Sequence, residues 1–236
     1  MTLAARLAAA PLALALAFAP AACGNDSRRT ETSTLTRGLI GNLIGLVKAG
    51  RTAGSGEPSA APTPDQIATA ALASFAGPLM LVTLEAQGQT TVMGLYGQNG
   101  PMRTYALPSE QSIILRDGIL AGTRGFGFDV MSAETEAVAE LILARKEGTA
   151  AKVQRYLDAE NVERPLPMDC VVQRADKSEF EIAGQTFGGT QMVEICTFQG
   201  QTVAGAYLVS DKGAVLASRQ WIGPELGYVT LQTLRP

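Results

Sequence analysis

The sequence predicts a mainly β fold, in which an antiparallel meander forms a barrel-like or sandwich domain. From Leu79 onward, short segments rich in β-branched and aromatic residues alternate apolar and polar positions with a period of two. Turn residues such as Asn99-Gly100-Pro101, Asp117-Gly118 and Gly200-Gln201 separate these segments. Short strands at even spacing with turns between them are typical of barrels and sandwiches.

One helix, at about residues 133–147, is expected between two runs of strands. Ser132 can cap its start, acidic residues lie in the first turn, basic residues lie in the last turn, and Gly148 follows it. Val138, Leu141 and Ile142 share one face. We therefore expect this helix to cover an open end or a face of the sheet.

A second helix is expected just before the first strand, over residues 65–75. Thr63 stands at its N-cap, Pro64 in its first turn and Gln66 at the third helical position, which together form a capping box. Gly77-Pro78 ends the alanine-rich segment.

The segment "LTRGLIGNLIGLVKAG", residues 35–50, has the pattern of a short amphipathic helix. One half of its helical wheel carries Leu35, Leu39, Ile40, Leu43, Ile44, Leu46 and Val47. Gly38, Gly41 and Gly45 gather on the other half, and each costs a helix about 1 kcal/mol relative to alanine. Such a helix needs a surface to dock against. Packing on the domain's own core is the simpler interpretation, and contact with a bilayer or a partner helix is the alternative.

The first 22 residues have the composition of an export signal. A short n-region with one arginine precedes the apolar run "LAAAPLALALAFAP", which is too short for an ordinary membrane span. The run ends in small residues directly before Cys23, which resembles the lipobox of a bacterial lipoprotein precursor, although Pro20 departs from the usual aliphatic residue. The alternative is an ordinary secretory peptide cut at A-x-A. We predict a signal peptide over 1–22 and lipidation at Cys23.

The rest of the chain divides into a tether region and a domain. Residues 23–64 hold the lipidated tether, the short amphipathic helix and a Gly/Pro/Ser/Ala linker, and 65–236 form a single β-rich domain. Gly24 follows the cysteine where an aspartate would indicate retention at the inner membrane. We therefore expect a lipid anchor in the outer membrane, on its periplasmic side.

The chain has three cysteines, and an exported protein with an odd number needs an explanation for the odd one. Acylation of Cys23 supplies that explanation. Cys170 and Cys196 are then free to form a disulfide in an oxidising compartment, which stabilises a fold by about 3 kcal/mol for a loop of this length. Two buried thiols are the competing interpretation.

Composition excludes several classes of function. The chain of 236 residues carries a net charge of −3 without a basic block, so we expect no nucleic-acid partner. It contains no histidine, which removes the commonest general base and the commonest transition-metal ligand. Two cysteines alone do not make a zinc site. We expect no metal and no cofactor.

The glycine-rich stretch "RDGILAGTRGFGFDVMSA", residues 116–133, invites comparison with a phosphate-binding loop. It lacks the lysine-serine and G-x-G-x-x-G patterns of such loops. Asp117-Gly118 fits a two-residue hairpin turn instead, and the later glycines fit bends or bulges in a curving strand. Arg116 and Arg124, on opposite arms of that hairpin, are candidate ligand-binding residues.

A second candidate ligand-binding surface lies near the C-terminus. Trp221 stands beside Arg219 at a strand end, and Tyr228 follows the intervening turn. An exposed tryptophan there would make a platform for stacking sugar rings. Packing in the core or at its rim is the alternative for a lone tryptophan.

Three separated stretches resemble a known family. They are "RDGILAGTRGFGFDVMSA", "TAAKVQRYLDAEN" followed by "PMDCVVQ", and "ASRQWIGPELGYVTLQTLRP". Together with the lipobox, they look like the YjbF-like group 4 capsule polysaccharide lipoproteins, from about residue 65 to the end. The resemblance implies a mostly antiparallel β fold, a lipid anchor and a role in secreting capsule or other exopolysaccharide. It brings no catalytic residue.

Three kinds of function follow from these observations. A glycosidase needs two carboxylates across a cleft, but no pair has a privileged spacing among Asp117, Asp129, Glu179, Glu181, Asp211 and Glu225. We therefore expect no catalytic activity. The main hypothesis is an accessory or scaffold of polysaccharide secretion, in contact with the membrane through its lipid and with secretion proteins or the polysaccharide. The alternative is a polysaccharide-binding module that stacks sugars on exposed aromatic residues.

Overall fold

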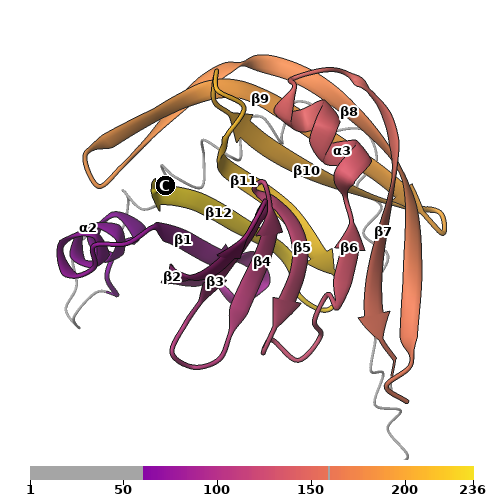
Figure 1. Cartoon of the computed structure of the whole chain (residues 1–236), viewed down its shortest axis with the longest axis horizontal. Coiled ribbons are helices and arrows are strands. Elements are labelled where there is room, and N and C mark those ends of the chain that lie inside the picture. The colour runs from indigo at the N-terminus through magenta and orange to yellow at the C-terminus, as the bar shows by residue number, and fades with distance from the viewer. Residues whose placement is uncertain (1–60, 159) are drawn as a thin grey trace, which may run out of the picture. The chain divides into compact units, whose positions relative to one another are not determined.

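The computed structural model describes residues 61–158 and 160–236 (Figure 1). Its first strands are β1 (Leu79–Leu84), β2 (Gln89–Asn99), β3 (Met102–Ala106), β4 (Ser112–Arg116) and β5 (Ile119–Arg124). The later strands are β6 (Ser132–Glu134), β7 (Gly148–Leu157), β8 (Glu163–Ile182), β9 (Gln185–Phe198), β10 (Gln201–Val209), β11 (Val215–Gly223) and β12 (Gly227–Arg235). The helices are α2 (Pro64–Ser74), the single 3₁₀ turn η2 (Glu85–Gln87) and α3 (Glu136–Leu143).

The twelve strands of the described residues belong to one antiparallel sheet in the order β5-β4-β3-β2-β1-β12-β11-β10-β9-β8-β7-β6. Strands that follow one another along the chain therefore pair, except that β5 and β6 form the two ends of the sheet, and β1 pairs with β12 to join the two runs. The predicted antiparallel meander is confirmed. Because chain neighbours pair through short turns, the alternating pattern of the sequence was sufficient to indicate this topology.

The sheet curves into a nearly closed barrel, so the barrel alternative of the prediction is the one observed. Its two end strands, β5 and β6, approach each other in Figure 1. The segment that connects them closes the gap, since the Thr123 amide donates to the Val130 carbonyl at 2.9 Å and the Met131 amide donates to the Arg155 carbonyl of β7 at 2.8 Å. Closure removes the unpaired edges that an open sheet would expose.

The β4–β5 hairpin has the predicted two-residue turn. Asp117 and Gly118 both adopt positive φ, +51° and +88°, as the mirror-image turn of a tight hairpin requires. Beyond this turn the register shifts, because Ile114 pairs with Gly122 while Leu115 pairs with Leu120. The predicted bulge in this curving strand is therefore present.

Helix α2 begins as predicted. The Thr63 hydroxyl accepts from the Gln66 amide at 3.3 Å, and the Gln66 side chain accepts from the Thr63 amide at 2.9 Å. Pro64 occupies the first turn, where its missing N–H costs nothing. The helix ends at Ser74, and Phe75 at its C-cap is extended.

The helix between the two β runs exists but is shorter than the predicted 133–147. Ser132, the expected cap, lies in β6 and pairs with Arg155. The helix covers Glu136–Leu143, Arg145 turns the chain with a φ of +53°, and Gly148 already starts β7. The helix is shorter because residues at its start, which helical propensity alone assigns to the helix, pair in strand β6 instead, and the chain turns at its end into strand β7.

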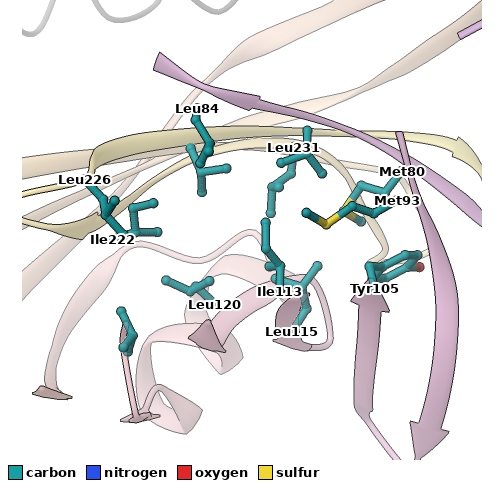
Figure 2. Packing of buried hydrophobic residues seen from close by; sticks show 13 residues of the cluster. Met80, Leu84, Met93, Tyr105, Ile113, Leu115, Leu120, Ile222, Leu226 and Leu231 are labelled. Carbon is teal, nitrogen blue, oxygen red and sulfur yellow. The ribbon is translucent and has the colours of Figure 1, made fainter. Parts of the chain in front are cut away.

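The barrel interior contains two adjoining apolar clusters. The first is built from β1–β5, β11 and β12, and Figure 2 shows its side chains converging between strands that face each other, including Met80, Met93, Tyr105, Ile113, Leu120, Ile222 and Leu231. The second packs the buried face of α3 against β7, β8 and β10, with Val138, Ile142, Met168, Val172, Met192 and Tyr207. Side chains of both clusters therefore pack inside the barrel.

A third apolar cluster lies on the outer face of the sheet. Leu79 and Leu81 point outward, on the opposite face from Met80 and Val82, because side chains alternate along β1. Helix α2 covers these outer residues with Ala68 and Ala71. The long β8–β9 hairpin extends toward α2 at the left of Figure 1, and its tip adds Phe180, Ile182 and the stacked ring of Phe187.

Several predictions concern residues outside the described part of the chain. The signal peptide over 1–22, lipidation at Cys23 and the amphipathic helix at 35–50 all fall there, and so does most of the tether region 23–64. Among the described residues, the helices are all too short or too polar to cross a bilayer.

Candidate functional site

The outer face of the barrel carries an open apolar groove beside the end of α2. Strands β1 to β4 form its floor, and the floor residues include Val92, Gly94, Thr104 and Ala106. Its volume is about 620 Å³. The groove is therefore large enough to accept several side chains of a binding partner.

The groove is hollow because its floor side chains are small. A Cβ atom added to Gly94 would meet only the Leu79 side chain, at 4.0 Å. The neighbouring positions on β3, Thr104 and Ala106, are also short. Helix α2 covers the adjacent apolar surface but stops at Ser74, so it leaves this part of the sheet open.

Two exposed aromatic residues stand at the rim. Phe75, at the C-cap of α2, is 62% exposed, and Tyr96 of β2 is 83% exposed. The loop between β3 and β4 supplies the opposite side with Leu107, Pro108 and Glu110. Large apolar side chains left in water around a hollow are typical of a binding surface.

The barrel interior contains a buried polar cluster that crosses several strands. Lys152 of β7 and Glu194 of β9 are 5% and 3% exposed, and the Lys152 ammonium lies 3.0 Å from the Glu194 carboxylate. The Tyr207 hydroxyl donates to the same carboxylate at 2.6 Å. Each charge in this pair therefore has a partner, as burial of charge requires.

Gln220 extends the polar cluster toward the opposite side of the barrel. Its side-chain oxygen accepts from the Leu120 amide of β5 at 2.8 Å, and its amide nitrogen donates to the Gly118 carbonyl at 2.9 Å. The nitrogen also lies 2.9 Å from the Ser218 hydroxyl. These hydrogen bonds connect the β4–β5 hairpin to β11, so the cluster stabilises the contact between strands on opposite sides of the barrel.

Two interior tyrosines have raised pKa values. Burial raises the pKa of Tyr207 well above its ordinary value, and the nearby negative charge of Glu194 raises it further. Burial also raises the pKa of Tyr156, whose hydroxyl donates to the Gln154 side chain at 2.7 Å. Both hydroxyls therefore stay protonated and serve as hydrogen-bond donors. This favours a structural role for them over a role in proton transfer.

Cys170 and Cys196 form the disulfide that cysteine counting predicted as one of two alternatives. They face each other directly on β8 and β9 and are almost completely buried. Glu194 lies beside them, which gives a cluster with the composition of three metal ligands. Disulfide sulfurs are not thiolates, however, so this cluster does not have the ligands that a metal ion needs.

The structure gives Arg116 and Arg124 partners within the protein. Arg124 donates to the Val130 carbonyl at 3.1 Å and to the Met131 carbonyl at 3.0 Å, so it holds the segment that closes the barrel. Arg116 forms an ion pair with Glu136 of α3 at 3.2 Å. The two arginines thus contact different elements, and their role in ligand binding remains a prediction.

Arg219 and Tyr228 lie together, and an acidic residue of the same chain joins them. The Arg219 guanidinium stacks 3.5 Å above the Tyr228 ring and binds the Glu85 carboxylate of η2 through contacts of 2.9 to 3.0 Å. Glu85 also accepts from the Thr230 hydroxyl at 2.7 Å. This arrangement ties η2 to the outer face of β11 and β12.

Trp221 lies opposite Tyr228 across β11 and β12, but it belongs to the second apolar cluster. It is 9% exposed and packs against the rings of Phe198, at 5.2 Å, and Tyr156, at 6.4 Å. This placement favours the core-packing alternative, since a ring that stacks on sugar needs an open face.

The carboxylates considered for catalysis are separated. Asp129 organises the β5–β6 loop by accepting from the Thr123 hydroxyl at 2.8 Å and the Gly125 amide at 2.9 Å. Glu179, Glu181, Asp211 and Glu225 are exposed on turns or outer strand positions. These contacts hold Asp129 in a structural role rather than across a cleft from a second acid.

The sequence analysis missed the groove and the interior polar cluster. A signal for the groove exists in hindsight, because the outward positions of β2 and β3 carry the small residues Gly94, Thr104 and Ala106. The register that places them side by side comes only from the structure, in which Gly94 pairs with Ala106. Lys152 and Glu194 carry no sequence signal, since charged residues on strands usually face water.

Comparison with known proteins shows the family. The model of the family described as "Group 4 capsule polysaccharide lipoprotein gfcB, YjbF" matches residues 34–234, so the chain belongs to this family of lipoproteins. Membership confirms the resemblance drawn from the three sequence stretches. It places the chain among envelope lipoproteins related to capsule polysaccharide.

A solved structure shows the same fold. The hypothetical lipoprotein YmcC from Escherichia coli (K12) matches with a TM-score of 0.64 at 17% sequence identity, over 73% of this chain and 90% of that one. An exported protein with a YmcC-like fold from Bacteroides fragilis matches with a TM-score of 0.27 at 11% identity, over 68% and 95%. No curated protein matches the sequence of the chain.

Proposed function

We propose that this protein is a non-catalytic accessory or scaffold in the secretion of capsule or other exopolysaccharide. It is held by a lipid on Cys23 at the periplasmic side of the outer membrane. One observation of the structure carries the proposal. The barrel interior is filled by apolar clusters and by a polar cluster whose buried charges are paired with each other, so the barrel serves as a rigid body.

Family membership and the sequence of the N-terminus support the other parts of the proposal. The family is one of lipoproteins related to group 4 capsule polysaccharide. The small residues before Cys23 resemble a lipobox, and Gly24 in the next position favours sorting to the outer membrane. A rigid barrel on a lipidated tether suits a protein that positions other components of an export machine.

Deletion of the gene tests the process, with surface-attached and released polysaccharide measured separately. We expect surface polysaccharide to fall and the wild-type gene to restore it. A Cys23→Ser gene should restore it poorly if the anchor matters. Normal polysaccharide in the deletion strain would remove the process assignment, and full rescue by Cys23→Ser would show that the anchor is dispensable.

A second experiment tests the scaffold part of the proposal. Chemical crosslinking of the lipidated protein in the envelope should capture one or more polysaccharide-secretion proteins. The same experiment with Cys23→Ser protein is the matched control for an anchored partner. Recovery of no secretion component from the lipidated protein would count against a scaffold.

A polysaccharide-binding module is the second candidate, and the exposed rings of Phe75 and Tyr96 at the rim of the groove favour it. The groove between them is mainly apolar and offers few hydrogen-bonding side chains, such as Thr104 and Ser112. Sugar recognition needs such partners. Calorimetric titration with oligosaccharides of the strain's own capsule would decide, since binding that is lost in Tyr96→Ala would favour the module.

A further inference from the structure

The outer groove constrains what can occupy it. Its floor is apolar, its rim carries the exposed aromatic rings of Phe75 and Tyr96, and Glu110 of the β3–β4 loop is the charged residue among its lining side chains. An occupant that fits must therefore present a row of apolar side chains. Any charge on it should be positive.

A segment of the chain itself, residues 35–50, has both properties. Leu, Ile and Val residues occupy one half of its helical wheel, as the sequence analysis found. Its charged residues are Arg37 and Lys48, and it has no acidic residue. As a helix it would be about 24 Å long. Isolated helices of this length are marginal in water, so the segment needs a docking surface.

The connection between the segment and the barrel permits this docking. Residues 51–63 can span at most about 45 Å when extended. They lead into the start of α2, and the other end of α2 forms the groove rim at Phe75, about 16 Å further along the helix axis. The segment can therefore fold back along α2 and reach the groove without strain in the linker.

The family match gives independent support. It begins at residue 34, directly before the amphipathic segment, and not at the start of the barrel. The polar residues 24–33 lie outside it. The segment is thus part of what this chain shares with its family, as expected for an element that packs against the shared fold.

We propose that residues 35–50 dock as a helix in the outer groove, with their Leu/Ile/Val face over the β2 and β3 floor and against Phe75 and Tyr96. The docked helix completes the third apolar cluster by extending the cover that α2 begins. Given the proposed lipid on Cys23, docking also shortens the free tether. Residues 24–34 then span at most about 40 Å between membrane and barrel, compared with about 140 Å for residues 24–63.

Photocrosslinking in the mature chain tests this contact directly. The chain carries Cys23→Ser, so that no lipid is attached, and p-benzoylphenylalanine in place of Tyr96, which keeps an aromatic ring at the rim. We expect crosslinks within one molecule to peptides from residues 35–50. Crosslinks between two molecules would show that a second copy fills the groove, and the absence of crosslinks to 35–50 would show that the groove is open; either result overturns the proposal.

Hydrogen exchange with a matched pair of variants provides the second test. Gly94→Leu fills the groove floor, whereas Gly97→Leu adds the same side chain further along β2, where a Cβ meets nothing within 4 Å. In the parent chain, amides of residues 35–50 should exchange about tenfold or more slowly than those of the flanking linker. Gly94→Leu should abolish this protection and Gly97→Leu should preserve it.

Variants within residues 35–50 provide a test that does not depend on a substitution in the barrel, which could disturb its folding. Leu43→Ser lies on the apolar half and should remove both the crosslink and the protection, while Gly41→Ser, on the glycine half, should retain them. Equal exchange in all four variants and in the parent chain would overturn the proposal. Because these measurements use purified, unlipidated protein, their failure is separate from failure of the proposed role in polysaccharide secretion.

Discussion

The interior of the barrel and its outer groove differ in how completely their side chains are packed and paired. Inside, every element of the Lys152–Glu194–Tyr207 cluster has a partner, and apolar side chains fill the remaining space. Outside, small floor residues leave a hollow, and the rest of the described chain leaves Phe75 and Tyr96 uncovered. The difference teaches that the interior contributes stability, whereas the outer face offers a binding surface. Substitutions in the two regions should therefore have different consequences.

The largest effect is expected from the buried ion pair. Glu194→Gln leaves the Lys152 ammonium buried without a counter-charge, and breaking such a pair from one side costs about 3–5 kcal/mol. Urea unfolding followed by circular dichroism measures this loss. Lys177→Met is the matched surface control, because Lys177 and its partner Asp211 are largely exposed, and its effect should stay below about 0.5 kcal/mol.

A double variant separates the pair from its surroundings. Lys152→Met combined with Glu194→Gln removes both charges and should recover part of the stability lost in Glu194→Gln alone. If the loss in the double variant equalled the sum of the losses in Lys152→Met and Glu194→Gln alone, the charges would not be coupled, and the cluster would not act as a unit.

The disulfide should contribute the next largest effect. Cys170 and Cys196 are separated by 26 residues, and closing a loop of this size stabilises a fold by about 3 kcal/mol in the chain-entropy model. Cys170→Ala combined with Cys196→Ala should lower the free energy of unfolding by about that amount. The parent chain measured under reducing conditions should show a similar loss, and equal stability of oxidised and reduced chains would contradict this prediction.

Alkaline pH should lower the free energy of unfolding, because two interior tyrosines lose their protons. A tyrosine in an unfolded chain has a pKa of about 10, and folding raises the pKa of both Tyr156 and Tyr207. Because the folded pKa is the higher one, the folded state binds these protons more tightly. Their stabilising contribution is complete below about pH 10 and is lost as the pH rises toward the folded values. Unfolding free energy should therefore fall above about pH 10, with a shallower fall in Tyr156→Phe.

The groove should tolerate substitution. Tyr96→Ala and Phe75→Ala remove rings that the barrel core does not cover, so each should change the unfolding free energy of the barrel by no more than about 0.5 kcal/mol, even where it weakens docking of residues 35–50. Thermal unfolding of both variants checks this. A loss of several kcal/mol from either would mean that the rim is part of the core and would remove the contrast between the two regions.

The smallest effect concerns Trp221, the only tryptophan of the chain. Its ring is 9% exposed against Phe198, so its emission should be blue-shifted and unchanged by capsule oligosaccharide. Fluorescence titration measures this. A shift on addition of oligosaccharide would restore the interpretation of Trp221 as a stacking platform.

Local patterns predicted well wherever neighbours in sequence decide the structure. The capping box of Thr63 and Gln66 and the Asp117-Gly118 hairpin turn are both present. Local patterns failed where a strand tolerates an irregularity. The sequence predicts short strands at even spacing, whereas β8 is 20 residues long and has a register shift between Arg174 and Lys177.

The candidate site was beyond prediction for a different reason. The exposed state of Tyr96 and the hollow over Gly94 depend on where α2 ends and which strands lie beside β2. The burial of Glu194 depends on Lys152, 42 residues away, and on Tyr207, 13 residues away. Such partners carry no common motif, so the pattern of the sequence cannot pair them.

The sequence by itself determined the family, the alternating strands, the turns and the start of α2, because each depends on side chains within a few residues of one another. The tertiary structure decided that the sheet closes as a barrel, that α3 is shorter, that Trp221 is buried, and that a groove forms on the outer face. These features arise from register and packing between distant strands. The free energy that stabilises these features comes from contacts between residues far apart in the sequence, and such contacts form only when the chain folds.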